Sequence, residues 1–169
     1  MSTPAPTDEL SRLAADAVAA LKARGLTIAT AEATTGGLIG HLLTSVPGSS
    51  AVFRGGVAPY SNAMKRTIGV SSEVLTEFGA VSREAAESLA TAVRTWSGAD
   101  IGLAETGIAG PSGRTPGLFW IATSVGRGPS SDSPPVIRSQ RFLFDGDRVT
   151  NHHSAAETAL RLILDALAG

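Results

Sequence analysis

The chain has 169 residues, a net charge of −1 and no cysteine; 43% of its residues are hydrophobic and 17% are charged. This composition fits one soluble domain with a hydrophobic core, and it excludes disulfide bonds and thiolate metal sites. The near-neutral charge and the lack of a long apolar run favour neither nucleic acid nor a membrane as a partner. Because the N-terminal residues are polar and show no signal-peptide pattern, we predict a cytoplasmic protein.

The first half of the chain alternates predicted helices and strands. Apolar residues recur at helical spacing between Leu10 and Leu21, and Gly25 can end that helix. In chain order the predicted elements are a helix from about residue 8 to 24, a strand over 26–32, a helix over 34–46, a β-like run over 51–58, and helical turns over 62–68 and 72–78.

The second half begins with a longer helix, for which Ser82 is a favourable N-cap. The inner face of this helix is expected to carry Ala85, Leu89, Val93 and Trp96. Trp120 is likewise expected at a core or interface position. The remaining predicted elements are strands over 100–106, 118–125 and 136–144, an exposed Gly/Pro/Ser-rich loop over 126–135, and a final helix from about residue 147.

Strands interleaved with helices predict an α/β layered domain with a central sheet. No internal repeat divides the chain, and no linker is long enough to separate two domains. We therefore predict a single domain over residues 8–169, preceded by a disordered or loosely held N-terminus over residues 1–7.

Three loops at predicted strand–helix junctions could bind an anion. Residues 33–37 combine backbone N–H groups, threonine hydroxyls and glycines, and Glu32 just before them could anchor the loop or orient a ligand. Residues 106–111 are of the same kind, and residues 145–148 place Arg148 at the start of the last helix. Glycines at such places also simply end strands and helices. Because ligands of open α/β sheets bind beyond the strand ends, the three loops together favour a phosphorylated small molecule.

Ser50, Tyr60 and Lys65 form the candidate reactive set. A serine attacks only if a base takes its proton, and a lysine can be that base if burial or nearby positive charge lowers its pKa. Backbone N–H groups in the turn around Ser49 could stabilise an oxyanion. Each of the three also has an ordinary structural interpretation, as a turn residue, a half-buried aromatic and a solvated charge. The three histidines show no familiar ligand spacing, so we predict no metal and no other cofactor.

Six segments taken together resemble one known family. They are Thr30–Gly37, Pro47–Ser50, Tyr60–Lys65, Gly79–Ser82, Thr106–Pro111 and Gly146–Arg148. In this order and spacing they are similar to the C-terminal domain of the competence/damage-inducible CinA proteins, a family that includes stand-alone nicotinamide-nucleotide amidases. The resemblance runs from the first predicted helix to the last, and six segments in register are more specific than any single one.

The resemblance implies a three-layer α/β/α sandwich with a central mixed sheet, a homodimer and no metal. It also implies hydrolysis of the carboxamide of nicotinamide mononucleotide, which gives nicotinic acid mononucleotide and ammonia. Ser50 would be the nucleophile, Lys65 its base, and Tyr60 a third member that assists proton transfer. The residues expected to bind this small-molecule substrate are Glu32, Thr34, Thr35, Gly36, Gly37, Ser49, Thr106, Gly107, Ala109, Gly110 and Arg148.

The chain departs from the family pattern at three places. Ala33 and Thr34 stand where the family usually has serine and cysteine, Glu105 replaces an apolar residue, and the loop over residues 112–117 is short. The Glu105 side chain should face away from that of Thr106, because neighbouring strand residues point to opposite sides. Two alternatives stay open: a catalytically idle CinA-like domain that binds a ligand or a partner and is linked to competence or DNA damage, and an amidase with a different substrate.

Overall fold

The computed structural model describes residues 6–126 and 133–168. In chain order its elements are α1 (Pro6–Arg24), β1 (Ile28–Glu32), α2 (Leu38–Thr44), the 3₁₀ turn η1 (Ser49–Ala51), β2 (Phe53–Val57), α3 (Asn62–Ile68), α4 (Ser72–Glu77), α5 (Arg83–Ser97), β3 (Ile101–Gly107), β4 (Leu118–Val125), β5 (Val136–Leu143) and α6 (Arg148–Ala168). Helix α1 begins within the expected N-terminal segment, and residues 1–5 of that segment lie outside the described residues. Most of the expected loop over 126–135 also lies outside them.

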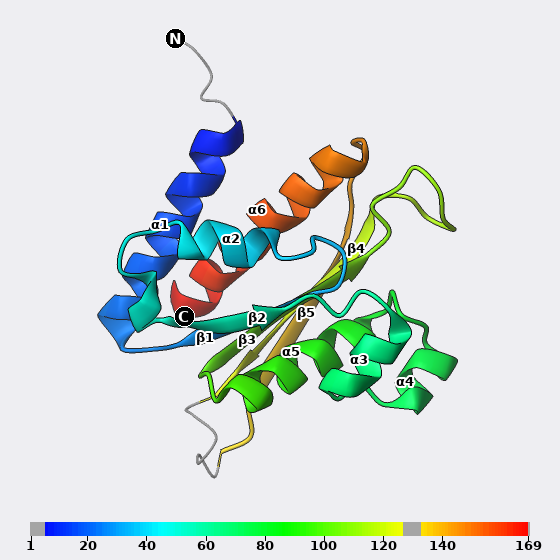
Figure 1. Cartoon of the computed structure of the whole chain (residues 1–169), viewed down its shortest axis with the longest axis horizontal. Helices are drawn as coiled ribbons and strands as arrows, with labels where there is room; N and C mark the ends of the chain where they lie inside the picture. The colour runs from blue at the N-terminus through cyan, green and yellow to red at the C-terminus, as the bar shows by residue number, and fades with distance from the viewer. Residues whose placement is uncertain (1–5, 127–132, 169) are drawn as a thin grey trace.

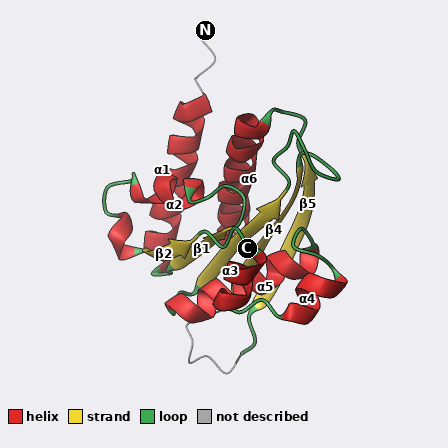
Figure 2. Cartoon of the chain, turned by 45° about the vertical axis from the view of Figure 1, so that its right-hand side comes forward, coloured by secondary structure: helices red, strands yellow, loops and turns green. Residues whose placement is uncertain are grey.

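The strands form one mixed sheet in the order β2-β1-β3-β4-β5. Strands β2, β1 and β3 are parallel, whereas β4 and β5 are antiparallel to their neighbours. Helices α1, α2 and α6 cover one face, and α3, α4 and α5 cover the other (Figure 1, Figure 2). The predicted three-layer α/β/α sandwich with a mixed sheet is therefore confirmed.

The two faces of the sheet carry side chains of different size. Large aliphatic residues such as Ile28, Leu103 and Ile121 face α1 and α6. Alanines such as Ala31 and Ala104 face α5, because neighbouring strand residues point to opposite sides. The small side chains let α5 lie close to the sheet.

Two local predictions differ from the structure. The helix expected over 34–46 begins only at Leu38, because Gly36 and Gly37 adopt positive φ values of 68° and 108° and form a turn before it. Trp96 is 66% exposed rather than internal, since it lies in the last turn of α5 and borders an open hollow. Trp120 packs partly buried against the α5-side core, as expected.

The parallel arrangement of β1, β2 and β3 gives the sheet a carboxyl edge and an amino edge. Glu32, Val57 and Gly107 end the three strands at the carboxyl edge. The turn η1 precedes β2 at the amino edge, and α3 follows β2 beyond the carboxyl edge (Figure 1). Within the described ranges, no helix combines the length and the apolar character that crossing a membrane requires.

Candidate functional site

A pocket of about 260 Å³ opens at the carboxyl edge of the sheet. This volume lies just below the usual range for small-molecule sites, roughly 300–1,000 Å³. The pocket joins the end of β1, the β2–α3 connection, the loop after β3 and the start of α6. The predicted site residues that line it are Thr34, Tyr60, Lys65, Thr106, Gly107, Ala109, Gly110 and Arg148.

Lys65 contributes a buried amine to the pocket. It lies on α3, which Ser61 caps by accepting a hydrogen bond from Met64 N. Lys65 is 4% exposed, and its Nζ donates a hydrogen bond to the main-chain oxygen of Tyr60 at 3.0 Å. Burial lowers the pKa of the Lys65 ammonium, and the charge of Glu105 partly opposes this shift. The amine is therefore suited either to bind an anion or to accept a proton.

Arg148 supplies the second cation, from the first turn of α6. Its guanidinium donates to Gly110 O at 2.9 Å and to the Tyr60 hydroxyl at 3.2 Å. Asn151, three residues further along α6, is buried and donates to Ala109 O at 3.0 Å. Helix α6 thus holds the loop after β3 in place. Arg148 also links this loop to the β2–α3 connection.

The threonine hydroxyls of the pocket bond to the main chain around it. Thr106 Oγ1 donates to Ala80 O at 2.6 Å. Thr34 Oγ1 accepts a hydrogen bond from Gly107 N at 2.7 Å and lies 3.2 Å from Gly107 O. These bonds fasten the end of β3 to the segment before α5 and to the turn after β1, so they shape the pocket.

Three of the N–H groups expected to cradle an anion at residues 33–37, those of Thr34, Thr35 and Gly37, are bonded to two carboxylates of the chain. Glu32 accepts hydrogen bonds from Gly37 N at 3.1 Å, Ile39 N at 2.8 Å and Gly40 N at 2.8 Å. Glu105 accepts from the N–H groups of Thr34 and Thr35 at 2.7 and 2.8 Å. The phosphate cradle expected at this loop stays a prediction, and the acceptors that its N–H groups already have within the chain count against it. Of its predicted binding residues, Glu32, Thr35, Gly36 and Gly37 do not line the pocket.

Glu105 itself is fully buried behind the pocket. It faces away from the Thr106 side chain, as strand geometry predicts, and points at the turn after β1. Burial raises the pKa of Glu105, the hydrogen bonds from Thr34 and Thr35 oppose the shift, and the charge of Glu32 adds to it.

The structure does not bring Ser50 to this pocket. Ser49 and Ser50 lie in η1, ahead of β2, whereas Tyr60 and Lys65 follow β2 at its other end. Strand β2 spans Phe53–Val57 and puts roughly 13 Å between these ends at a rise of about 3.3 Å per residue. Ser50 is exposed, and the Tyr60 hydroxyl bonds to Arg148 instead. The predicted Ser50–Tyr60–Lys65 relay is therefore not assembled in this structure.

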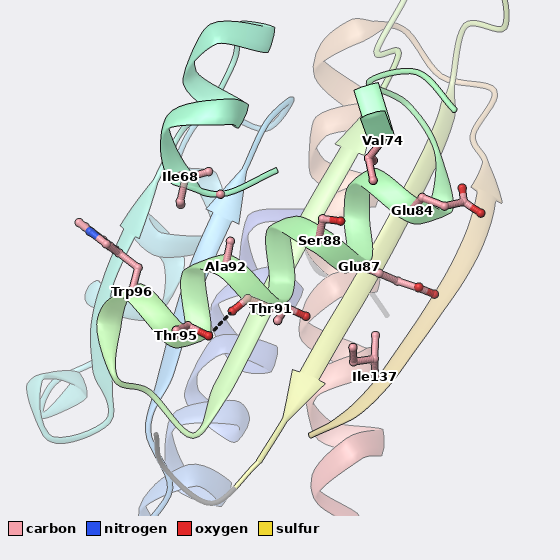
Figure 3. A pocket seen from close by; sticks show the side chains of 11 residues that line it. Ile68, Val74, Glu84, Glu87, Ser88, Thr91, Ala92, Thr95, Trp96 and Ile137 are labelled. Carbon is pink, nitrogen blue, oxygen red and sulfur yellow. Dashed lines mark hydrogen bonds between the residues drawn. The ribbon is translucent and has the colours of Figure 1, made fainter. Parts of the chain in front are cut away.

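A larger hollow of about 670 Å³ lies beside α5 (Figure 3). Trp96, Ile68 and Ile137 border it, together with the carboxylates of Glu84 and Glu87. Neither a lysine nor an arginine is among its lining residues, so it does not suit an anionic ligand. Within residues 6–126 and 133–168, no cluster of three or more His, Asp or Glu side chains is arranged to hold a metal ion.

Several residues of the site were not predicted from the sequence. Ala33 lines the same pocket as Lys65, and in the sequence it stands out only as a departure from the family pattern. Ala80 and Val81 also line it, and they belong to the Gly79–Ser82 segment that carried part of the resemblance. Asn151, which anchors the loop after β3, follows Arg148 by less than one helical turn, and nothing in the local sequence pattern distinguishes it.

Comparison with known proteins places the whole chain in one group. The CinA C-terminal domain family matches residues 10–167. A CinA-like protein of Chlorobium phaeovibrioides is 40% identical over 94% of this chain and 41% of its own length. A CinA-like protein of Anaeromyxobacter sp. is 45% identical over 95% of this chain and 38% of its own length. The chain thus spans about two-fifths of the length of these relatives.

Solved structures agree with the sequence comparison. The competence/damage inducible protein CihA from Agrobacterium tumefaciens superposes with a TM-score of 0.85 and 36% identity, covering 100% of both chains. A CinA superfamily protein from Klebsiella pneumoniae gives a TM-score of 0.86 and 33% identity, covering 94% of this chain and 98% of its own. The chain therefore belongs to the CinA C-terminal domain family.

Proposed function

We propose that the pocket at the carboxyl edge binds a small phosphorylated ligand of the nicotinamide mononucleotide type. The observation that carries this proposal is the convergence of Lys65 from α3 and Arg148 from α6 on one pocket. The phosphate of such a ligand would pair with these cations, since an arginine and a buried lysine both favour phosphate oxygens. The acids Glu32 and Glu105 are bonded to main-chain N–H groups behind the pocket and do not line it.

We further propose that the wild-type chain binds this ligand without hydrolysing it through Ser50. Amide hydrolysis by a serine requires the hydroxyl and its base to lie side by side. The serine among the lining residues of the pocket is Ser112, from the loop after β3, and not Ser50. At the end of β1, Ala33 stands in place of the usual family serine. This reasoning favours the alternative of a ligand-binding CinA-like domain.

A second candidate is amide hydrolysis by another group of the same pocket. The lowered pKa of Lys65 suits a general base, and the Thr34 hydroxyl lines the pocket with it. A water molecule or Thr34 would then attack the carboxamide. The homodimer and the cytoplasmic location implied at the sequence level stay predictions, which sedimentation and cell fractionation would test.

Titration calorimetry with nicotinamide mononucleotide tests the binding proposal. Lys65→Met removes the buried charge and should lower the affinity at least tenfold, about 1.4 kcal/mol. Lys22→Met is the matched control, because Lys22 is the other lysine of the chain and is exposed at the amino edge. Equal affinities of wild type and Lys65→Met would refute the proposed site.

Ammonia release from the same ligand separates the two candidates. The binding proposal expects no release above the protein-free rate. Release that Lys65→Met abolishes and Ser50→Ala leaves unchanged would establish the second candidate. If Ser50→Ala abolishes the release, Ser50 is the nucleophile after all, as the resemblance implies.

A further inference from the structure

Two buried acids meet at a single hydroxyl behind the pocket. Glu32 on β1 and Glu105 on β3 are direct partners in the parallel register. Thr35 Oγ1 lies 2.8 Å from Glu32 Oε2 and 2.9 Å from Glu105 Oε1. All three side chains are buried.

This arrangement requires that one of the two acids carries a proton. A threonine hydroxyl carries one hydrogen and can donate it to only one acceptor. If Thr35 donates to one carboxylate, its contact with the other is a hydrogen bond only when that second acid is protonated and donates to Thr35 Oγ1. Two ionised carboxylates would leave one close oxygen–oxygen contact without a hydrogen.

The hydrogen bonds of the two acids differ, and they point to Glu105 as the protonated one. Glu32 receives N–H donors on both of its oxygens, from Ile39 on Oε2 and from Gly40 on Oε1. Both N–H donors of Glu105 reach Oε1, and its Oε2 is buried with no hydrogen bond to any described residue. A bare carboxylate oxygen in the interior is costly, whereas a neutral carboxyl costs much less.

We propose that Glu105 is protonated at neutral pH, so that Glu105 donates a hydrogen bond to Thr35 Oγ1 and Thr35 donates one to Glu32. In this state Glu105 acts as a positioning residue that holds the turn carrying the pocket residues Ala33 and Thr34. The raised pKa of Glu105, caused first by burial and then by the Glu32 charge, agrees with this assignment. The part that concerns ligand binding rests on the proposed function. The protonation of Glu105 does not depend on the proposed function.

The charged groups around Glu105 give its ionisation a consequence for an anionic ligand. The charge of Lys65 on α3 interacts with Glu105 from the pocket side, and the charge of Glu32 interacts with it from β1. Its register partner on β4 is the apolar Ile121. Helix α2 contributes only the exposed His41, and α6 carries Arg148 and His152 in its first turns. A neutral Glu105 leaves Lys65 without a buried counter-charge, so the anion of a ligand can supply one. An ionised Glu105 would compete with it.

The first test follows stability against pH in wild type, Glu105→Gln and the exposed-acid control Glu77→Gln. The pKa of Glu105 is raised by folding, so its stabilising contribution is complete below the unfolded pKa of about 4.3 and is lost as pH rises through the folded pKa. Wild type should therefore lose melting temperature relative to Glu105→Gln as the pH rises from the unfolded pKa through the raised folded pKa. Glu77→Gln should follow wild type. Parallel curves for wild type and Glu105→Gln, or a wild type that gains on Glu105→Gln with rising pH, would overturn the assignment.

Carbon-detected NMR of the wild type decides the point even if Glu105→Gln fails to fold. The Glu105 carboxyl carbon should resonate at neutral pH in the range of protonated acids and move on raising the pH. A shift in the ionised range at neutral pH contradicts the proposal.

The second test measures the affinity for nicotinamide mononucleotide across the same pH range. Titration of the ligand phosphate affects both proteins alike, so the comparison isolates Glu105. With rising pH, wild-type affinity should fall by about threefold or more relative to Glu105→Gln. The reason is that an ionised Glu105 would offset the positive charge of Lys65 and compete with the ligand anion. An identical pH dependence in both proteins overturns the positioning role. No binding by wild type at any pH overturns the proposed function and the positioning role with it, while the unfolding and NMR measurements still decide the proton.

Discussion

The polar groups at the two edges of the parallel strands have different kinds of partners. At the amino edge, Thr27 and Asp100 satisfy each other: Thr27 N and Oγ1 donate to Asp100 Oδ2 at 2.9 and 2.8 Å, and Asp100 N donates to Thr27 Oγ1 at 3.1 Å. At the carboxyl edge, Glu32 and Glu105 hold main-chain N–H groups, while Lys65 and Arg148 line a pocket. Reciprocal pairing stabilises the fold, whereas cations beside a cavity are available to a ligand.

The largest effect on stability is expected for Glu32→Gln at the carboxyl edge. The carboxylate of Glu32 accepts three main-chain N–H bonds and lies within 2.8 Å of the Thr35 hydroxyl. The amide of glutamine would turn an NH₂ group toward such donors, so the free energy of unfolding should fall by about 3 kcal/mol. Urea unfolding at neutral pH measures the change.

Asp100→Asn is the matched change at the amino edge. Asparagine can keep its oxygen toward both Thr27 donors, so the expected loss is only about 1 kcal/mol. A larger loss for Asp100→Asn than for Glu32→Gln would reverse the comparison, because the carboxylate at the amino edge would then contribute more to stability.

The next largest effect is a gain of activity in Ala33→Ser. Ala33 is 4% exposed and lines the pocket with Lys65, so a serine there would add a hydroxyl at the position where the family usually has a serine, in a pocket that also holds a base. Ammonia release from nicotinamide mononucleotide should rise at least tenfold above wild type, about 1.4 kcal/mol in activation free energy. Adding Lys65→Met should remove the gain.

Ala80→Ser serves as the control for this gain. Ala80 lines the same pocket from the segment before α5, and its carbonyl already accepts the Thr106 hydroxyl. An equal gain in Ala33→Ser and Ala80→Ser would mean that the position of the hydroxyl does not matter, which the proposed geometry does not allow.

Arg148→Ala should weaken ligand binding, and the loss of affinity should be smaller than the loss that unfolding of the chain would cause. The exposed guanidinium joins Gly110 O and the Tyr60 hydroxyl at the rim of the pocket. Losing one charged contact to a phosphate should lower the affinity about tenfold, or about 1.4 kcal/mol. Calorimetry against Arg141→Ala, an exposed arginine of β5, measures it; the same loss in both variants would point to net charge rather than to the pocket.

Local patterns in the sequence predicted the order of the elements well. Helical spacing and the Ser82 cap located α5, whose Ala85 N donates to Ser82 Oγ at 3.1 Å. The resemblance supplied the layer arrangement. Trp96 was placed inside because spacing ignores where a helix end leaves the sheet, and this tryptophan lies in the last turn of α5.

The site was harder to predict because its bonds join distant segments. The turn over residues 33–37 shows donors in the sequence, but the acceptor of Thr34 N and Thr35 N is Glu105, far along the chain on β3. Only the pairing of β1 with β3 brings that acid to the turn. The local sequence therefore indicated the N–H donors, but it could not show that Glu105 already accepts their hydrogen bonds.

The smallest effect is expected for Ser50→Ala, and it tests the comparison most directly. Ser50 precedes β2 at the amino edge and is exposed, so removing its hydroxyl should change the free energy of unfolding by no more than about 0.5 kcal/mol. Affinity for nicotinamide mononucleotide should stay within about twofold of wild type, because a charged contact worth about 1.4 kcal/mol would shift it tenfold. Ser45→Ala, another exposed serine ahead of β2, controls for surface changes. A tenfold loss confined to Ser50→Ala would place ligand at the amino edge, and the division between a structural edge and a binding edge would no longer hold.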